Sequence, residues 1–184
     1  MRGNKLRAWS LELGVCCLLL GCFCGCASSY GWKPSVPQKM RTVCVPTFRN
    51  ESDVQELGAI ATRQLLREIQ REGTFKIRRA GEAALEIQGV VKSAGCSVGA
   101  YDRRTEMAQN SYNYTAVAEV SVIDKRSRKV LADNLRFTAK TQFTSGQDQS
   151  TAMRNASGRL MDDLSRQIVD SLLGLKWERN GENE

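Results

Sequence analysis

The sequence predicts an α+β fold, a two-layer sandwich in which two amphipathic helices pack on one face of a mostly antiparallel sheet of about four strands. Two stretches with helical periodicity enclose a series of stretches that alternate apolar and polar residues. The expected order is therefore β-α-β-β-β-β-α. With 184 residues, 41% of them hydrophobic, the chain is long enough for one domain with a substantial core and too short for two of ordinary size.

The first 25 residues have the pattern of a bacterial lipoprotein signal. Three basic side chains come first: Arg2, Lys5 and Arg7. An apolar run follows that is too short to span a membrane as a stable helix, and it ends in Gly-Cys pairs. In such signals the cysteine is acylated before cleavage. We expect residues 1–25 to be removed and Cys26 to carry the lipid, with Cys22 as the alternative.

The remaining cysteines do not indicate a metal site. The chain has no histidine, and only Cys44 and Cys96 follow Cys26, which is too few ligands for zinc. Export would expose these two thiols to an oxidising compartment, where a Cys44–Cys96 disulfide can persist. The alternative is that both are free thiols buried on strands.

The charge of the chain favours an anionic partner. Removal of residues 1–25 leaves 24 Lys and Arg against 19 Asp and Glu, a net charge of +5. A basic exported domain suits phosphorylated glycolipid, anionic headgroups or peptidoglycan carboxylates, although the charge could also serve solubility alone. Nucleic acid is not expected, because export separates the chain from it.

The folded domain is predicted to span residues 41–175, after a lipidated N-terminus and proline-containing tether at 26–40. A strand is expected at 41–48, where β-branched residues alternate. A helix follows, with Ser52 and Gln55 at capping-box spacing and Gly73 as its C-terminal cap. Its apolar stripe comprises Val54, Leu57, Ala61, Leu65 and Ile69.

The middle of the chain predicts a meander of strands. A short strand at 74–77 and another at 85–91 precede an aperiodic, glycine-containing stretch at 93–111 that we interpret as a long hairpin loop. Residues 112–124 alternate strongly, and a basic turn at 124–129 connects them to a partner strand at 130–143.

A second amphipathic helix is expected from 147 to 173. Its stripe comprises Met153, Ala156, Leu160, Leu164, Ile168 and Leu172. Gly158 weakens this helix by about 1 kcal/mol relative to alanine, which suggests close packing at that point. Residues 176–184 are predicted to be a polar tail.

Enzymatic activity is not expected. Without histidine, the usual base for a serine or cysteine nucleophile is missing. The glycine-containing "GEAALEIQG" leads into a strand rather than a helix, so it is not a phosphate-binding loop. Asp162 and Asp163 are adjacent in a helix and do not face each other. No cofactor is predicted.

Several segments together resemble the LptE family of outer-membrane lipopolysaccharide-assembly lipoproteins. They are Cys26 shortly before Tyr30-Gly31, then "VCVPTFRNES", a helix ending "REIQREGTFKI", an "ALEIQGVV" strand, a tyrosine-led strand ending "VSVID", and the C-terminal amphipathic helix. The resemblance covers about residues 26–175 and rests on order and spacing more than on an invariant motif. It implies two helices packed on a four-stranded sheet, which agrees with the layout above.

The resemblance also implies a function. Family members are non-enzymatic lipoproteins that plug the LptD β-barrel in the outer membrane, assist its assembly and bind lipopolysaccharide. This implies a lipid-anchored protein of the cell outer membrane that faces the periplasm or lies inside the barrel lumen. A plug in a wide, polar lumen should itself have a polar and charged surface.

Basic side chains in two loops are candidates for contact with lipopolysaccharide phosphates or with the barrel wall. They are Arg103 and Arg104 in the predicted loop, and Lys125, Arg126, Arg128 and Lys129 in the basic turn. The alternative is that the basic turn only aids solubility and discourages edge pairing.

The segment "VPTFRNES", which leads into a helix, leaves a second class of function open. This segment also resembles small envelope lipoproteins related to the curli-secretion pore protein and to activators of peptidoglycan synthases. The chain would then be a pore subunit or an enzyme regulator. The tyrosine-led strand and the short tether after Cys26 favour the first class.

Overall fold

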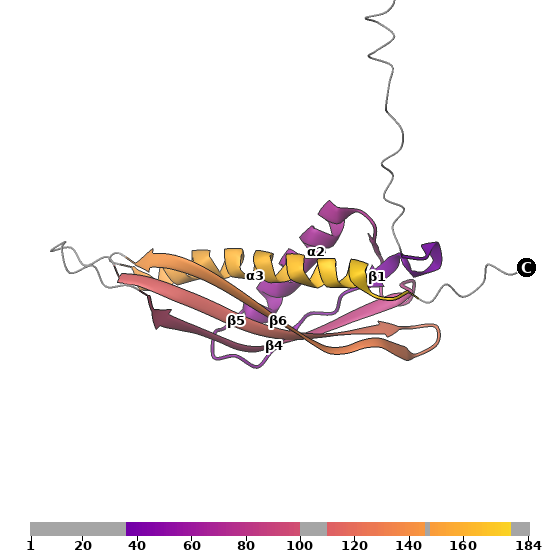
Figure 1. Cartoon of the computed structure of the whole chain (residues 1–184), viewed down its shortest axis with the longest axis horizontal. Helices are drawn as coiled ribbons and strands as arrows, with labels where there is room; N and C mark the ends of the chain where they lie inside the picture. The colour runs from indigo at the N-terminus through magenta and orange to yellow at the C-terminus, as the bar shows by residue number, and fades with distance from the viewer. Residues whose placement is uncertain (1–35, 100–109, 146–147, 178–184) are drawn as a thin grey trace, which may run out of the picture. The chain divides into compact units, whose positions relative to one another are not determined.

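The computed structural model describes residues 36–99, 110–145 and 148–177. Its elements are η1 (Gln38–Met40), β1 (Thr42–Cys44), β2 (Arg49–Asn50), α2 (Leu57–Glu72), β3 (Lys76–Ile77), β4 (Leu85–Val98), β5 (Asn110–Asp124), β6 (Lys129–Ser145) and α3 (Gln149–Gly174). Both long helices lie on the same face of the sheet (Figure 1). The predicted α+β sandwich is therefore confirmed.

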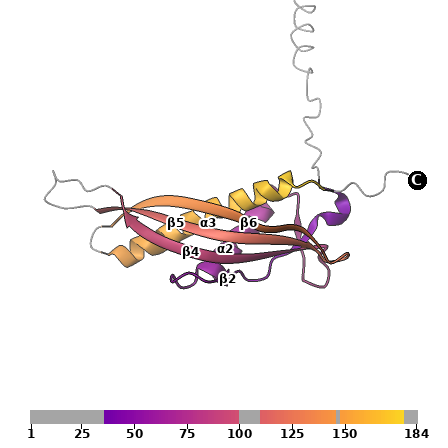
Figure 2. The same cartoon turned by 60° about the horizontal axis from the view of Figure 1, so that its bottom comes forward.

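The sheet is mixed and has more strands than expected. Its order is β3-β1-β4-β5-β6, and the short β2 also pairs with β4. The long strands β4, β5 and β6 form an antiparallel meander, whereas β1, β2 and β3 pair in parallel with their neighbours. Figure 2 shows β2 beside β4. Two- and three-residue strands are too short to give a periodic signal, so their parallel pairing was not predictable from alternation.

The core lies between the helices and the sheet. In β5 the predicted inward face is confirmed, because alternate residues from Tyr114 to Val122 are buried. The stripes of the two helices meet this face, and α2 and α3 also pack against each other. The helix residues that form the buried stripes include Leu57, Ala61, Leu65, Ile69, Ala156, Leu160, Leu164, Ile168 and Leu172. Each fully buried leucine or isoleucine contributes about 1.5–3 kcal/mol.

The predicted loop at 93–111 is wrong at both ends, because β4 extends into it and β5 already begins at Asn110. β4 continues to Val98, and its residues from Ser93 onward pair with β5 up to Tyr112. Almost every side chain from Lys92 to Val98 is exposed, so neither face of this end of the strand is buried and the sequence carries no alternation there. Cross-strand backbone hydrogen bonds hold it in the sheet instead.

The start of the first helix is also different from the prediction. Helix α2 begins at Leu57, after Glu56 in a left-handed conformation with φ of 65°, and no side chain caps it. Ser52 is not the cap, because its hydroxyl donates to Asn50 Oδ1 at 2.7 Å. Asn50 Nδ2 in turn donates to the Val54 carbonyl at 2.8 Å, so a local turn uses the groups that a capping box would need. The C-terminal cap is as predicted, with Gly73 at φ of 84°.

The two cysteines of the domain have free thiols in this structure. Cys44 is buried on β1, where it lies opposite Glu86 of β4, whereas Cys96 is exposed ten residues further along β4. At about 3.3 Å per residue this places them roughly 33 Å apart. A disulfide needs Cα atoms within about 7 Å, so the fold does not allow the intramolecular disulfide that the sequence leaves possible.

The end of α3 leads into residues that the sequence assigned to a polar tail. Trp177 packs on Phe75, with ring centroids 6.2 Å apart, and belongs to the edge of the core. The fold therefore extends at least to residue 177. Within the described ranges, no helix has the length and apolar character needed to cross a membrane.

Candidate functional site

The basic turn between β5 and β6 is held together by Asp124. Its carboxylate accepts hydrogen bonds from the Arg126 backbone N–H at 2.9 Å and from Ser127 Oγ at 2.7 Å. Burial opposes ionisation of Asp124, but the hydrogen bonds from Ser127 and Arg126 outweigh it and hold the pKa below its usual value. The turn closes with Arg128 at φ of 55°. The carboxylate thus fixes a compact turn from which the basic side chains project.

The four basic residues predicted in this turn are not equivalent. Lys125 is partly buried, and its Nζ lies 3.0 Å from Glu86 Oε2 on β4. Arg126, Arg128 and Lys129 are exposed. Lys125 is therefore committed to an internal ion pair, while the two arginines present their guanidinium groups to solvent at one end of the sheet.

Glu86 contacts several side chains at this end of the sheet, and no pattern in the sequence indicates this role. It accepts hydrogen bonds from Gln88 Nε2 at 2.7 Å and lies beside the Cys44 thiol. The hydrogen bonds from Gln88 and Lys125 lower the pKa of Glu86. The bond between Lys125 and Glu86 also raises the pKa of Lys125. Burial is the main cause of the raised pKa of Cys44. The carboxylate stays ionised and holds Lys125 in place.

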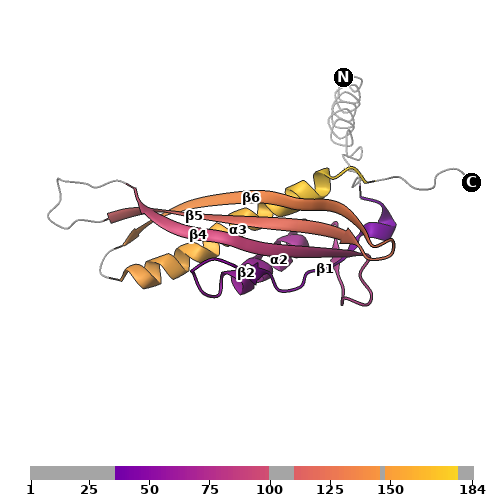
Figure 3. The ribbon, with the colours of Figure 1, turned by 90° about the horizontal axis from the view of Figure 1, so that it is seen from below.

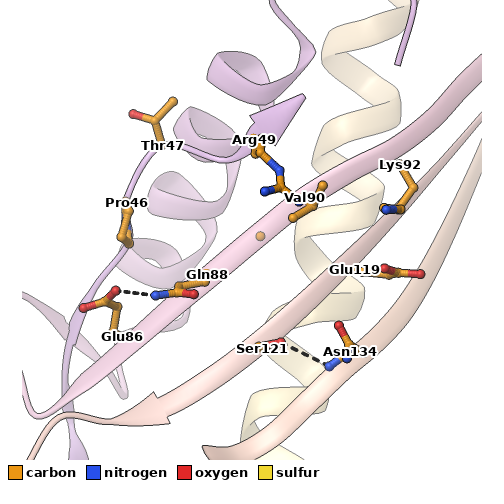
Figure 4. Close-up of a pocket in the computed structure, with 11 residues that line it drawn as sticks. Pro46, Thr47, Arg49, Glu86, Gln88, Val90, Lys92, Glu119, Ser121 and Asn134 are labelled. Carbon is orange, nitrogen blue, oxygen red and sulfur yellow. Dashed lines mark hydrogen bonds between the residues drawn. The ribbon is translucent and has the colours of Figure 1, made fainter. Parts of the chain in front are cut away.

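The sheet face opposite the helices is open and hydrophilic. Figure 3 shows β4, β5 and β6 from this side, with the helices behind them. A shallow depression of about 510 Å³ lies here, close to the segment that precedes β2. The labelled side chains in Figure 4 line it: Pro46, Thr47, Arg49, Glu86, Gln88, Val90, Lys92, Glu119, Ser121 and Asn134.

Charges on this open face are distributed in opposite-sign pairs rather than gathered into a catalytic group. Glu51 forms ion pairs with Arg49, at 2.6 Å, and with Lys92. Glu119 on β5 lies opposite Arg136 on β6 in the strand register. Such pairs contribute little to stability individually, but together they give a face that is well solvated. Within residues 36–99, 110–145 and 148–177, no three His, Cys, Asp or Glu side chains gather in a way that could bind a metal ion.

Other predicted site residues lie outside the described residues. Cys22 and Cys26 precede residue 36, and Arg103 and Arg104 fall between 99 and 110. The structure brings together only the residues of the basic turn. Trp177 falls in the predicted polar tail, although an aromatic residue five positions after the last residue of the helical stripe was an available signal.

A protein-family model described as lipopolysaccharide assembly, LptE, matches residues 40–172. No curated protein matches the chain. Among solved structures, a hypothetical protein from Chlamydia trachomatis is 14% identical with a TM-score of 0.52, over 73% of this chain and 96% of that one. A minor lipoprotein from Acinetobacter baumannii is 10% identical with a TM-score of 0.46, over 73% of this chain and 94% of that one. The likeness to the Chlamydia protein supports the fold.

Proposed function

The chain belongs to the LptE, lipopolysaccharide-assembly, family, and we propose that it acts as a non-enzymatic outer-membrane lipoprotein that plugs an LptD-type β-barrel, helps assemble it and binds lipopolysaccharide in transit to the cell surface. The observation that carries this proposal is the family match, which spans almost the entire described domain, from residue 40 to residue 172. The second class considered above, a curli-related pore subunit or a peptidoglycan-synthase activator, has no comparable support.

The surface of the domain supports the role of a plug. The lumen of a large outer-membrane barrel is polar, so a protein inside it must present hydrophilic walls. The open sheet face does so, with Glu51, Arg49 and Lys92 in one ion-paired group and Glu119 opposite Arg136. Only two large hydrophobic side chains of the described residues are strongly exposed, Val98 and Val130.

Attachment to the outer membrane is proposed to occur through the acylated Cys26, with Cys22 as the alternative. Acyl chains contribute about 0.8 kcal/mol per buried methylene, so several chains on one cysteine would anchor the protein stably. Residues 27–35 would then connect the anchor to the domain, which begins near Val36. The domain would face the periplasm or lie in the barrel lumen.

Lipopolysaccharide binding is proposed to involve the basic turn. Arg126 and Arg128 are exposed, and a guanidinium can bind a phosphate through two parallel hydrogen bonds. Lys129 lies beside them, whereas Lys125 contributes by holding the turn against Glu86. Arg103 and Arg104 remain further candidates for contact with lipopolysaccharide or the lumen wall.

The test of lipopolysaccharide binding removes charge from the turn without changing its backbone. An Arg126→Gln/Arg128→Gln double variant is expected to bind purified lipopolysaccharide about fivefold to tenfold more weakly at low salt, because two charge-assisted contacts are lost. The matched control, Arg63→Gln/Arg67→Gln, removes two exposed arginines from α2 and should bind normally. Equal binding by both double variants and the unmodified protein would exclude the turn as the contact site.

A further inference from the structure

A pocket at one end of the domain has the features of a lipid-binding site. It has a volume of about 480 Å³, within the usual range for small-molecule sites, and lies between η1, the β5–β6 turn, the start of β6 and the residues after α3. Figure 1 shows these elements together at the right-hand end of the sheet. Its apolar lining comes from Met40, Val130, Leu131, Leu175 and Trp177.

An indole N–H is left without a partner at this pocket. Trp177 lines the pocket and its Nε1 is buried, yet among the residues that the structure describes no group accepts its hydrogen bond. A buried donor without an acceptor costs about 1–3 kcal/mol, and buried tryptophan N–H groups usually have partners. The ring packs against Phe75, with ring centroids 6.2 Å apart. The nitrogen is shielded from solvent, so a ligand oxygen would satisfy it only after the side chains around the indole shift.

The mouth of the pocket is positively charged. Lys39, Lys129 and Lys176 line it together with a single acidic residue, Asp124. The Asp124 carboxylate already accepts hydrogen bonds within the turn. The residual charge is therefore suited to an anionic group at the mouth, while the apolar wall is suited to a hydrocarbon chain inside.

Val130 adds a second reason to expect an apolar occupant. Its side chain is half exposed, at 50%, although it lies at the start of a strand beside Leu131, another apolar residue of the pocket. The other strongly exposed valine, Val98, lies at the opposite end of β4 and does not line the pocket. The two valines therefore form a matched pair for mutagenesis.

We propose that this pocket binds an acyl chain of an anionic lipid, with the chain against Val130, Leu131 and Met40, an ester or amide carbonyl accepting from Trp177 Nε1–H, and the anionic group near Lys39 and Lys176. The proposal rests on the proposed lipopolysaccharide binding and adds the place where an acyl chain of the lipid would bind. The exposed arginines of the basic turn, next to Lys129, would contact the phosphorylated headgroup of the same lipid.

The test uses Trp177 as its own reporter. In full-length protein with Trp9→Phe and Trp32→Phe, Trp177 is the remaining tryptophan, and a phospholipid with brominated acyl chains quenches a tryptophan that it contacts. We expect saturable quenching by brominated phosphatidylglycerol and weaker quenching by brominated phosphatidylcholine. Inorganic phosphate should neither quench nor compete, because the hydrocarbon chain provides most of the affinity.

Variants locate the site. Val130→Asp should weaken binding about tenfold or more, because it places a carboxylate against the hydrocarbon chain, while Val98→Asp should not change it. Lys39→Gln/Lys176→Gln should weaken binding about threefold at low salt, with Lys140→Gln as an exposed control. In a displacement assay with a fluorescent fatty acid, Trp177→Phe should lower the affinity about fivefold, since it keeps the ring and removes the donor.

The proposal is wrong if brominated lipid fails to quench Trp177, if Val130→Asp and Val98→Asp bind alike, or if inorganic phosphate competes with the lipid. These outcomes would leave barrel association and the dependence of lipopolysaccharide binding on Arg126 and Arg128 unaffected. Circular dichroism and thermal unfolding of each variant show whether a loss of binding reflects loss of fold. Failure of the pocket is thus distinguishable from failure of the proposed function.

Discussion

Two glycines show that the tertiary structure decides whether a glycine position has room for a side chain. Gly89, in the middle of β4, faces Phe48, and a Cβ built there would lie 2.2 Å from the Phe48 ring. Gly158, in α3, was expected to mark close packing, but that interpretation is wrong, because a Cβ at this position would meet nothing within 4 Å. The sequence alone does not distinguish the two positions.

These two glycines predict opposite effects of the same substitution. Gly158→Ala should raise the free energy of unfolding by about 0.5–1 kcal/mol, since alanine favours the helix and no atom obstructs it. Gly89→Ala should lower it by about 1–3 kcal/mol, because the buried Phe48 ring must move. Urea unfolding of both variants measures the difference. A stabilising Gly89→Ala or a clearly destabilising Gly158→Ala would contradict the packing described.

At the scale of the element, one-sided burial decides which parts of the fold could be predicted. The inward faces of α2, α3 and β5 were recovered because each buries one face and exposes the other. The far half of β4 exposes both faces, so its sequence lacks alternation and predicts a loop. The predicted start of α2 is wrong because the Ser52 hydroxyl donates to Asn50, which in turn donates to the Val54 carbonyl, so a local turn forms in place of the capping box.

The candidate site was predictable only where its signal was local. The run of basic residues at 125–129 is visible in the sequence. The ion pair that keeps Lys125 partly buried is not, because only the pairing of β4 with β5 brings Glu86 close to it. The pocket joins residues from positions 37 to 177, so no local pattern could reveal it. Its tryptophan falls in the predicted tail because the residues around it are polar.

The outer edge of β6 is protected by α3. Gln167 Nε2 donates to the Thr138 carbonyl at 3.2 Å, and Arg159 Nη2 lies 3.5 Å from the Gln142 carbonyl. These contacts occupy backbone groups that an edge strand otherwise offers to another strand. Protection of this edge therefore does not depend on the basic turn alone. The exposed arginines of the turn are then available for a ligand.

The N-terminus of α3 gives a pH-dependent prediction. Asp148 caps this helix by accepting from the backbone N–H groups of Ser150 and Thr151, at 3.0 and 3.2 Å. Hydrogen bonds from Thr151 and Ser150 lower the pKa of Asp148 from 3.8 to about 2. A carboxyl with a depressed folded-state pKa stabilises the protein fully above pH 4, and this contribution is lost as the pH falls toward 2.

Asp148→Ala should therefore lower the melting temperature at pH 7, and the difference from the unmodified protein should narrow as the pH falls from 4 to 2. Asp170→Ala is the matched control, because it removes an exposed aspartate from the last part of the same helix, where a negative charge does not favour the helix dipole. Thermal unfolding across this pH range measures both. A difference that persists unchanged at pH 2 would exclude the ionised cap.

At the scale of the whole molecule, the domain separates three kinds of surface. The helices cover one face of the sheet, the other face is open and carries paired charges, and one end combines a basic turn with an apolar pocket. The proposed binding of lipopolysaccharide would use this end, because an amphiphilic lipid presents anionic and apolar groups side by side.

The proposed role as the plug of an LptD-type barrel can be tested by purifying the tagged full-length protein from membranes in a mild detergent. Mass spectrometry of the purified material is expected to show an LptD-type barrel in about equal amount, together with an acylated N-terminal cysteine. Recovery of a penicillin-binding protein in its place, or of the lipoprotein with no barrel at all, would contradict the account.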